Sequence, residues 1–189
     1  EALKISIANI RRKWLRKGST SIAIHVRMGD YISVKHEDQH FLKTGSDERV
    51  PKHALDLFWK TANLLAVKAF NETAKNFSSI FITTDNQFAL EAANYALGSS
   101  NLYYSEGLFR HSDLDVRNDS SGLKMLTDWF LLSEADVVIQ GPWSTFIEKA
   151  LVYSNRKQRI FRCHVVLNKV KHGKAISHKN EWGCFENIL

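Results

Sequence analysis

Three short polar segments of this sequence carry side chains that could bind a phosphorylated ligand. The first, residues 25–30, reads His-Val-Arg-Met-Gly-Asp and directly follows a β-rich apolar run. Arg27 could hold phosphate oxygens with two parallel N–H donors, and Gly29 would permit a tight turn beside it. The other interpretation is a surface arginine that pairs with Asp30 beside a turn. The residues alone support both interpretations equally.

The second segment, residues 83–86, reads Thr-Thr-Asp-Asn and follows the next apolar run. Its simplest role is to cap the helix that begins after it, because Asp and Asn side chains accept hydrogen bonds from the first backbone N–H groups of a helix. Asp85 could also accept hydrogen bonds from the ribose or the base of a nucleotide. One residue can perform both roles.

The third segment combines Asp128 with residues 141–146, Gly-Pro-Trp-Ser-Thr-Phe. Ser144 and Thr145 stand at an expected helix start, where hydroxyl groups and unpaired backbone N–H groups can bind an anion. An ordinary helix cap explains them equally well. Asp128 lies in an otherwise apolar helix, where a carboxylate usually faces solvent, although it could instead be aimed at the N–H groups of a guanine.

The elements that must position these segments alternate along the chain. Apolar residues at helical spacing predict helices over 2–17, 51–69, 86–97, 123–134 and 144–153. Short β-rich runs predict strands over 21–26, 79–83, 101–104, 136–140 and 159–166. This alternation predicts a single α/β domain over residues 1–189, built on a doubly wound parallel sheet of about five strands. Ligands bind outside the carboxyl ends of such strands, where the polar segments begin.

The tail that follows the last strand reads as irregular. It contains one of the two cysteines, and Cys163 and Cys184 could close one disulfide that pins residues 163–189 to the body. Two cysteines are too few for a zinc site. Both this pairing and three possible N-glycosylation sites favour a secretory compartment. The sites are Asn71, Asn76 and Asn118.

Composition restricts the class of protein. The 189 residues are 44% hydrophobic and 24% charged, which is ordinary for a globular domain and excludes a disordered chain. The net charge of +6 is modest, and its basic residues are mostly dispersed, so we expect them to form solvated surface. No apolar stretch approaches the roughly 18 residues of a membrane span. The chain begins at Glu1, and we interpret it as a portion of a longer protein.

Together, these segments resemble the fucosyltransferase superfamily with an H-x-R motif, which includes α1,2-, α1,6- and protein-O-fucosyltransferases. Residues 25–30 look like its first motif, H-x-R-x-G-D, and residues 81–86, Phe-Ile-Thr-Thr-Asp-Asn, look like the second, a strand that ends in T-D-D. Residues 126–136, Leu-Thr-Asp-Trp-Phe-Leu-Leu-Ser-Glu-Ala-Asp, with Trp-Ser-Thr-Phe at 143–146, look like the third and most specific motif. The resemblance spans residues 25–153.

This resemblance implies a GT-B enzyme made of two Rossmann-like halves, of which this chain looks like the C-terminal, donor-binding half. The donor would be GDP-fucose, whose sugar moves with inversion to a glycan or glycoprotein acceptor, without a metal or another cofactor. Arg27 would hold the β-phosphate and act as the catalytic residue that stabilises the departing GDP. The other implied donor contacts are His25 at the nucleotide, Gly29 and Asp30 beside Arg27, Asp85 and Asp128 at the guanosine, and Ser144 and Thr145 at the phosphates.

The implied partners are GDP-fucose, an acceptor and the missing N-terminal half, in a single-pass membrane protein of the Golgi or the ER lumen. The sequence departs from the family pattern at Met28, where many relatives have a second arginine, and at Asn86, where T-D-D has its second carboxylate. Lys35 stands where the α1,6 group has a glutamate base, so no base is assigned, and we expect the fragment to be inactive by itself.

Two other classes of protein are possible on the residues. One is a non-catalytic α/β module that binds a nucleotide or a polyanion. The other is a basic nucleic-acid-binding domain, which the sequence disfavours because no strand interleaves stacking aromatic residues with Lys and Arg. We therefore expect no nucleic-acid partner. The sequence also lacks the glycine-rich motifs of dinucleotide folds and P-loop enzymes, and it lacks the usual metal-binding patterns.

Overall fold

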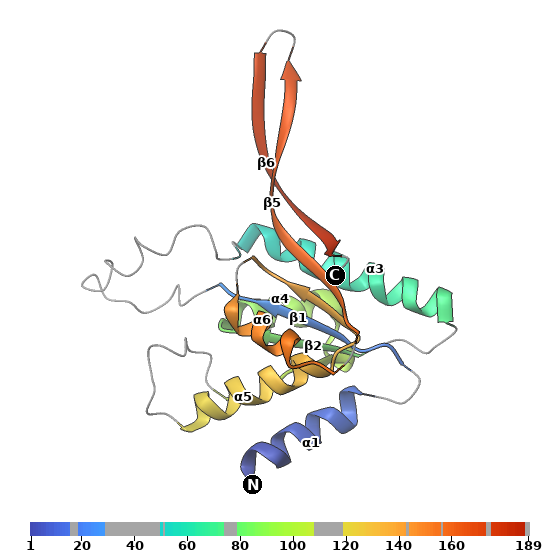
Figure 1. The fold of residues 1–189 in the computed structure, drawn as a ribbon, viewed down its shortest axis with the longest axis vertical. Coiled ribbons are helices and arrows are strands. Elements are labelled where there is room, and N and C mark those ends of the chain that lie inside the picture. The colour runs from blue at the N-terminus through green and yellow to red at the C-terminus, as the bar shows by residue number, and fades with distance from the viewer. Residues whose placement is uncertain are drawn as a thin grey trace, which may run out of the picture.

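Apolar residues fill the central strands of this chain along their whole length. Every residue of β1 (Ile22–Val26), β2 (Ile80–Thr84) and β4 (Val137–Gln140) is buried. Strands that are buried on both faces need helices on either side, as in a parallel sheet with helical connections. The computed structural model has this arrangement (Figure 1). It describes residues 1–15, 19–28, 50, 52–73, 79–107, 119–142, 144–155, 157–172 and 175–187.

The sheet has six strands in the order β3-β2-β1-β4-β5-β6. β3 (Leu102–Tyr103) and β5 (Arg159–His172) are parallel to the central three, and β6 (Ala175–Asn187) is antiparallel to β5. The parallel strands confirm the doubly wound α/β fold predicted from the sequence. The chain builds outward from β1 through β2 to β3, and then returns to the other side of β1 with β4. This switch point is where open α/β sheets form a ligand crevice.

Helices cover both faces of the sheet. Alternate residues of β1 belong to two separate apolar clusters, as expected when strand side chains alternate between faces. The cluster around Ala23 includes residues of α1 (Ala2–Trp14), α5 (Asp119–Glu134) and α6 (Thr145–Val152). The cluster around Ile22 and Ile24 includes residues of the 3-10 turn η2 (Lys52–Ala54), α3 (Leu55–Thr73) and α4 (Gln87–Leu97). Within the described residues, no helix is both long and apolar enough to cross a bilayer.

Most helix ends follow from the local sequence. Asn86 caps α4 by accepting a hydrogen bond from the backbone N–H of Phe88 at 2.9 Å, and Gly98 follows its last residue with a φ of 79°. A second 3-10 turn, η3 (Ser99–Asn101), then leads into β3. α5 starts at Asp119 and not at residue 123 as predicted, because its first turn, Asp-Ser-Ser-Gly, lacks the apolar residue that marks a helix in a sequence.

The prediction of an irregular tail is wrong. β5 runs well past its expected end, and the tail returns beside it as β6 in a continuous antiparallel register from Ile160–Asn187 to His172–Ala175. The outer part of this two-stranded ribbon extends beyond the rest of the fold (Figure 1). Frequent Lys, His and Asn residues obscure the β pattern of the tail. A signal was present nonetheless, since Gly173 and Lys174 lie midway between the two cysteines and a glycine-first pair suits a tight hairpin.

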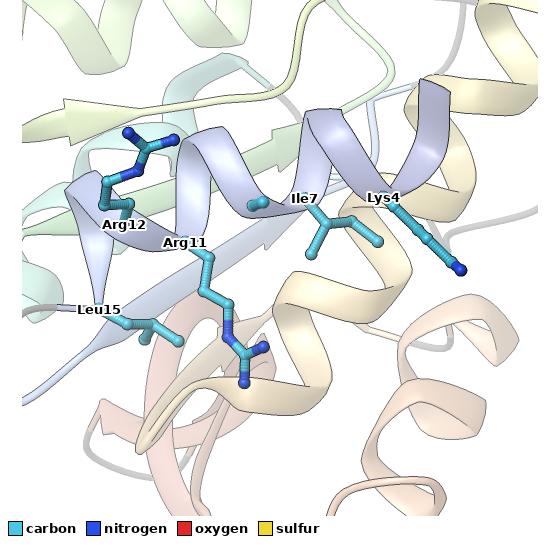
Figure 2. Close-up of a pocket in the computed structure, with 6 residues that line it drawn as sticks. Lys4, Ile7, Arg11, Arg12 and Leu15 are labelled. Atoms are coloured by element: carbon cyan, nitrogen blue, oxygen red, sulfur yellow. The ribbon is translucent and has the colours of Figure 1, made fainter. Parts of the chain in front are cut away.

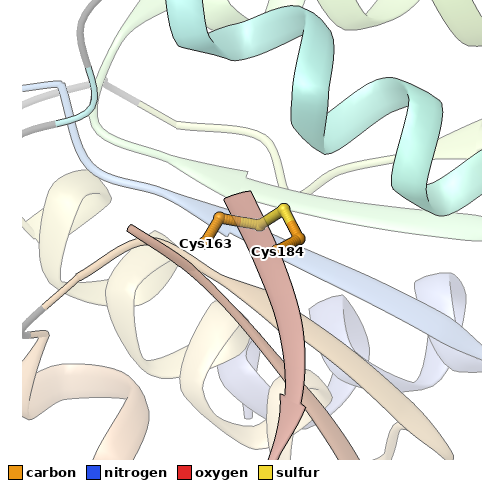
Figure 3. Close-up of a disulfide and its surroundings, with 2 residues drawn as sticks. All are labelled: Cys163 and Cys184. Atoms are coloured by element: carbon orange, nitrogen blue, oxygen red, sulfur yellow. A yellow bond between two sulfur atoms is a disulfide. The ribbon is translucent and has the colours of Figure 1, made fainter. Parts of the chain in front are cut away.

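The disulfide between Cys163 and Cys184 joins the two strands of this ribbon (Figure 3). The two residues are directly opposite each other in the register of β5 and β6. Cys163 is fully buried, and Cys184 and Trp182 pack against the apolar cluster that includes α3. The disulfide therefore fastens the ribbon where it leaves the sheet, and the tail is part of the fold.

Removing the disulfide should destabilise the domain without changing its fold. Replacement of both cysteines, Cys163→Ala with Cys184→Ala, should lower the free energy of unfolding by about 3 kcal/mol, because a loop of roughly 20 residues is no longer closed in the unfolded chain. Urea unfolding followed by circular dichroism measures this change. Wild-type protein in a reductant should match the double variant. Two free thiols in unreduced, denatured wild type would contradict the pairing.

Candidate functional site

The carboxyl ends of β1, β2 and β4 lie side by side. His25 is in register with Thr83 of β2 and with Gln140 of β4, so the residues that follow these strands emerge next to one another. We call these three strand ends, with the residues that directly follow them, the C-terminal rim. The structure therefore brings together the segments of Arg27, Asp85 and Ser144, which are far apart in the sequence.

Two hydrogen bonds hold the chain as it leaves β1. The carbonyl of Arg27 accepts one from the backbone N–H of Val50 at 2.9 Å. The backbone N–H of Met28 donates to Oδ1 of Asp85 at 2.8 Å. The backbone at the half-buried Arg27 is thus held at the rim, in part by a carboxylate from the neighbouring strand end. Gly29 and Asp30, which were also predicted to bind the donor, lie outside the described residues.

Asp85 and Asn86 divide the two roles that the sequence suggested for their segment. Asn86 caps α4, while the Asp85 carboxylate reaches across to the backbone after β1. The backbone N–H of Asn86 also donates to the hydroxyl of Thr84 at 3.2 Å. Asp85 is therefore a residue of the rim, and the helix cap is supplied by its neighbour.

The segment after β4 approaches β1 closely. The backbone N–H of Gly141 donates to the carbonyl of His25 at 3.1 Å, and a Cβ at Gly141 would lie 2.8 Å from Cγ2 of Val50. This spacing leaves no room for a side chain unless Val50 moves. Ser144 precedes α6 as its N-cap, but its hydroxyl makes no capping bond. Thr145, in the first turn of α6, is exposed.

His25 lies beneath the rim and is 7% exposed. Its Nε2 is 2.9 Å from the hydroxyl of Ser144, and its Nδ1 is 3.3 Å from the hydroxyl of Thr83. Burial lowers the pKa of His25 to about 3, and the positive charges of Arg27 and Lys124 act in the same direction. His25 is therefore neutral at physiological pH and contributes hydrogen bonds but no positive charge.

Asp128 does not face solvent, which was the simpler expectation for a carboxylate on α5. It is 4% exposed and accepts hydrogen bonds from the Ser105 hydroxyl and from Nζ of Lys124, the latter at 2.8 Å. Burial raises the pKa of Asp128, while Lys124 and the hydroxyls of Ser105 and Thr83 act in the opposite direction. Sequence reasoning missed Lys124, although an acid–base pair four residues apart within an apolar helix is a recognisable signal.

These side chains could bind an anion, and carboxylates close by could accept hydrogen bonds from hydroxyl or N–H groups of the same ligand. Arg27 stands at the rim, and a guanidinium suits phosphate oxygens. Asp85 lies one strand away, and carboxylates accept from ribose hydroxyls and from base N–H groups. Among the described residues, no three His, Cys, Asp or Glu side chains gather in a group that could hold a metal ion.

A separate hollow runs along α1 and has no residue in common with the rim (Figure 2). Arg11 at this hollow pairs with Glu134 of α5 at 2.8 Å. Because all its lining residues lie on α1 or directly after it, the hollow is not part of the site at the C-terminal rim. Its lining residues are Lys4, Ile7, Ala8, Arg11, Arg12 and Leu15.

The possible glycosylation sites are only partly described. Asn71 is exposed in the last turn of α3. Asn76 and Asn118 lie outside the described residues. Glycosylation at all three positions stays a prediction.

The fold of this chain is similar to that of solved fucosyltransferases. The fucosyltransferase NodZ from Bradyrhizobium matches with a TM-score of 0.50 and 17% identity, over 85% of this chain and 43% of that chain. NodZ alpha-1,6-fucosyltransferase soaked with GDP-fucose gives a TM-score of 0.49 and 16% identity, over 98% and 48% of the two chains. POFUT1 in complex with GDP-fucose gives a TM-score of 0.42 and 14% identity, over 84% of this chain and 45% of that chain. No protein-family model matches the chain, and no curated protein matches it by sequence.

The match to NodZ at a TM-score of 0.50 shows that this chain has a fucosyltransferase-like α/β fold. The chain spans less than half the length of each of these solved structures. The likeness therefore concerns the architecture of one part of such an enzyme.

Acid should destabilise the fold through His25. Its pKa is about 3 in the folded protein, against an ordinary value of 6.5, so between these values the unfolded chain binds a proton that the folded protein does not. The free energy of unfolding should therefore fall as the pH drops below 6.5, by up to about 1.4 kcal/mol per pH unit from this residue. Urea unfolding from pH 7 to pH 4 measures the slope.

His25→Gln should flatten this part of the pH profile, because the variant has no imidazole to protonate. His53→Gln is the matched control, since His53 is exposed on η2. A His25→Gln profile that runs parallel to the wild-type profile would show that His25 is not the group responsible.

Proposed function

We propose that this chain is the donor-binding part of a glycosyltransferase that moves fucose from GDP-fucose to a glycan or glycoprotein acceptor. The observation that carries the proposal is the meeting of three motif segments at one rim, where Asp85 holds the backbone after Arg27 and His25 contacts Ser144 at the start of α6. The fucosyltransferase-like fold is consistent with it. A sheet whose ligand crevice lies at the switch point beside β1 would hold the nucleotide there.

Arg27 is the proposed catalytic residue. Its guanidinium would bind the β-phosphate and offset the negative charge that develops on GDP as the bond from the β-phosphate oxygen to the anomeric carbon breaks. Backbone N–H groups at the start of α6 and the exposed Thr145 hydroxyl would bind the same diphosphate. With these donors the reaction needs no metal. Attack by the acceptor hydroxyl from the opposite face of the sugar would invert the anomeric carbon.

The remaining site residues divide into donor contacts and supports. Gly29 and Asp30 are proposed to lie beside the diphosphate, next to Arg27. Asp85 would accept hydrogen bonds from the guanosine while it holds the backbone after Arg27. His25, Asp128 and Ser144 are engaged with other side chains of this protein, and we propose that they support the nucleotide site from beneath.

The acceptor is proposed to bind the N-terminal half of the same enzyme, which would close over the donor from the other side of the crevice. Reaction requires the acceptor hydroxyl to be held close to the anomeric carbon. We propose the Golgi or the ER lumen as the location of the parent protein, because the disulfide and the sequon that begins at the exposed Asn71 suit an oxidising compartment with glycosylation machinery.

Arg27→Lys should weaken GDP binding by about 10- to 100-fold, because the lysine keeps the charge but loses the paired N–H donors. Isothermal titration calorimetry with GDP, and with ADP as the comparison for base recognition, measures the effect. Arg12→Lys is the matched control, since Arg12 is exposed on α1 and bonds only to Asn9 among the contacts described here. Equal GDP affinity in wild type and Arg27→Lys would refute the assignment of Arg27.

The chain by itself should bind GDP but should not transfer sugar. Its C-terminal rim would be occupied by the donor, which would leave none of the described residues there to position the acceptor hydroxyl. Incubation with labelled GDP-fucose and a panel of glycan and glycopeptide acceptors tests this expectation. Transfer at a rate near that of the full-length enzyme would contradict the role as a donor half.

A further inference from the structure

Two residues that are paired across neighbouring strands each have a buried polar atom without a hydrogen-bond partner. The atoms are Oε1 of Gln140 on β4 and Nε of Arg162 on β5, and neither bonds to any residue that the structure describes. Gln140 as a whole is only 2% exposed. Buried polar atoms almost always have a partner, so such an exception needs a physical explanation. Oε1 can only accept a hydrogen bond and Nε–H can only donate one, which makes the two atoms complementary.

The strand register places both residues on the face of the sheet that α6 covers. Gln140 is in register with His25 on one side and with Arg162 on the other, so the three side chains project from the same face. Ala23 and Val138, each two residues earlier on its strand, belong to the apolar cluster that includes residues of α6. His25, Gln140 and Arg162 therefore form a row across β1, β4 and β5 at the level of the C-terminal rim.

The two ends of this row contact the start of α6. Nε2 of His25 is 2.9 Å from the hydroxyl of Ser144, whose carbonyl accepts a hydrogen bond from the backbone N–H of Glu148 at 3.1 Å. Nη2 of Arg162 is 3.8 Å from Oε1 of Glu148. Arg162 thus lies one helical turn from Ser144, on the β5 side of α6, whereas His25 lies on the β1 side.

The guanidinium of Arg162 has N–H groups to offer to a ligand. Its distance to Glu148 is too long for a hydrogen bond, and Nε has no partner among the described residues. The two side chains are 42% and 48% exposed, and an ion pair of this kind contributes little stability. An anion that reaches Arg162 from solvent therefore has only a weak competitor in Glu148.

We propose that Arg162 is a second arginine of the donor site and binds the diphosphate from the β5 side of α6, opposite Arg27. The inference rests on the proposed function, which supplies the diphosphate of GDP-fucose. As the guanidinium turns from Glu148 to the phosphate oxygens, its Nε–H donates to Oε1 of Gln140. Both unpartnered atoms then gain a hydrogen bond in one movement, and Gln140 is a positioning residue that orients Arg162.

A second guanidinium gives each phosphate its own pair of N–H groups. Arg27 can bind two oxygens of one phosphate, and Arg162 would bind the other phosphate in the same manner. Together, the two positive charges would share the negative charge that develops on GDP as it departs.

Arg162→Gln should weaken GDP binding by about 10- to 100-fold, because hydrogen bonds from a charged group to the diphosphate are lost. Arg162→Lys should have an intermediate affinity, since lysine keeps the charge but has no Nε–H for Gln140. Isothermal titration calorimetry with GDP measures both changes. Lys149→Gln is the matched control, because it removes the same charge from an exposed position of α6 next to Glu148, and it should keep the wild-type affinity.

Gln140→Met separates a positioning role from a structural one. It should weaken GDP binding by about 3- to 10-fold in the wild type but not in Arg162→Gln, because its effect acts through Arg162. A merely structural role would weaken binding in both backgrounds. The free energy of unfolding without ligand should not fall, because Oε1 of Gln140 bonds to none of the described residues.

Equal GDP affinity in the wild type, Arg162→Gln and Arg162→Lys would overturn the inference and leave the proposed function standing. Equal weakening by Gln140→Met in both backgrounds would overturn the positioning role of Gln140. If Arg162→Gln does not fold, the affinity of Arg162→Lys decides the role of Arg162. A wild type that does not bind GDP would overturn the proposed function and, with it, the inference, so the two failures give different results.

Discussion

Burial of the central strands on both faces is the constraint on which the rest of this structure depends. β1 contributes alternate residues to two apolar clusters, and the polar side chains of β1, β2 and β4 are confined to the carboxyl ends of these strands. Even there, His25 and its partners lie beneath the surface, and each needs a hydrogen-bond partner inside the protein. The geometry of the rim follows from this requirement, because β1 must stay in register with both neighbours for His25 to reach Thr83 and Ser144.

The sequence was a good guide wherever a single local signal determined the structure. Near-continuous apolar runs identified β1, β2 and β4, and Gly98 marked the end of α4. The parallel order of five strands followed from their alternation with helices. The tail was misread because β6 is polar and gains its stability from pairing with β5 and from the disulfide. Neither of these is visible as hydrophobic periodicity.

The candidate site was predictable to a lesser extent, for a physical reason. Parallel topology brings strand ends together, so the adjacency of Arg27 and Asp85 could be expected from the order of elements. The order of elements could not predict which atoms form hydrogen bonds with each other. Asp128 is paired with Lys124 one turn away, but also with Ser105, which lies in a connection 23 positions earlier. Such a contact depends on how α5 packs over the end of β3, and no local pattern records that packing.

The ribbon formed by β5 and β6 has two regions with different surroundings. From Ile160 to Arg162, β5 has β4 on one side and β6 on the other, whereas beyond Arg162 it pairs only with β6. An isolated two-stranded hairpin is marginally stable in water. The disulfide lies at the boundary between the two regions. Opening of the ribbon that starts at its outer end would therefore stop at Cys163 and Cys184, and amide hydrogens on the two sides of that crosslink would exchange with solvent at very different rates.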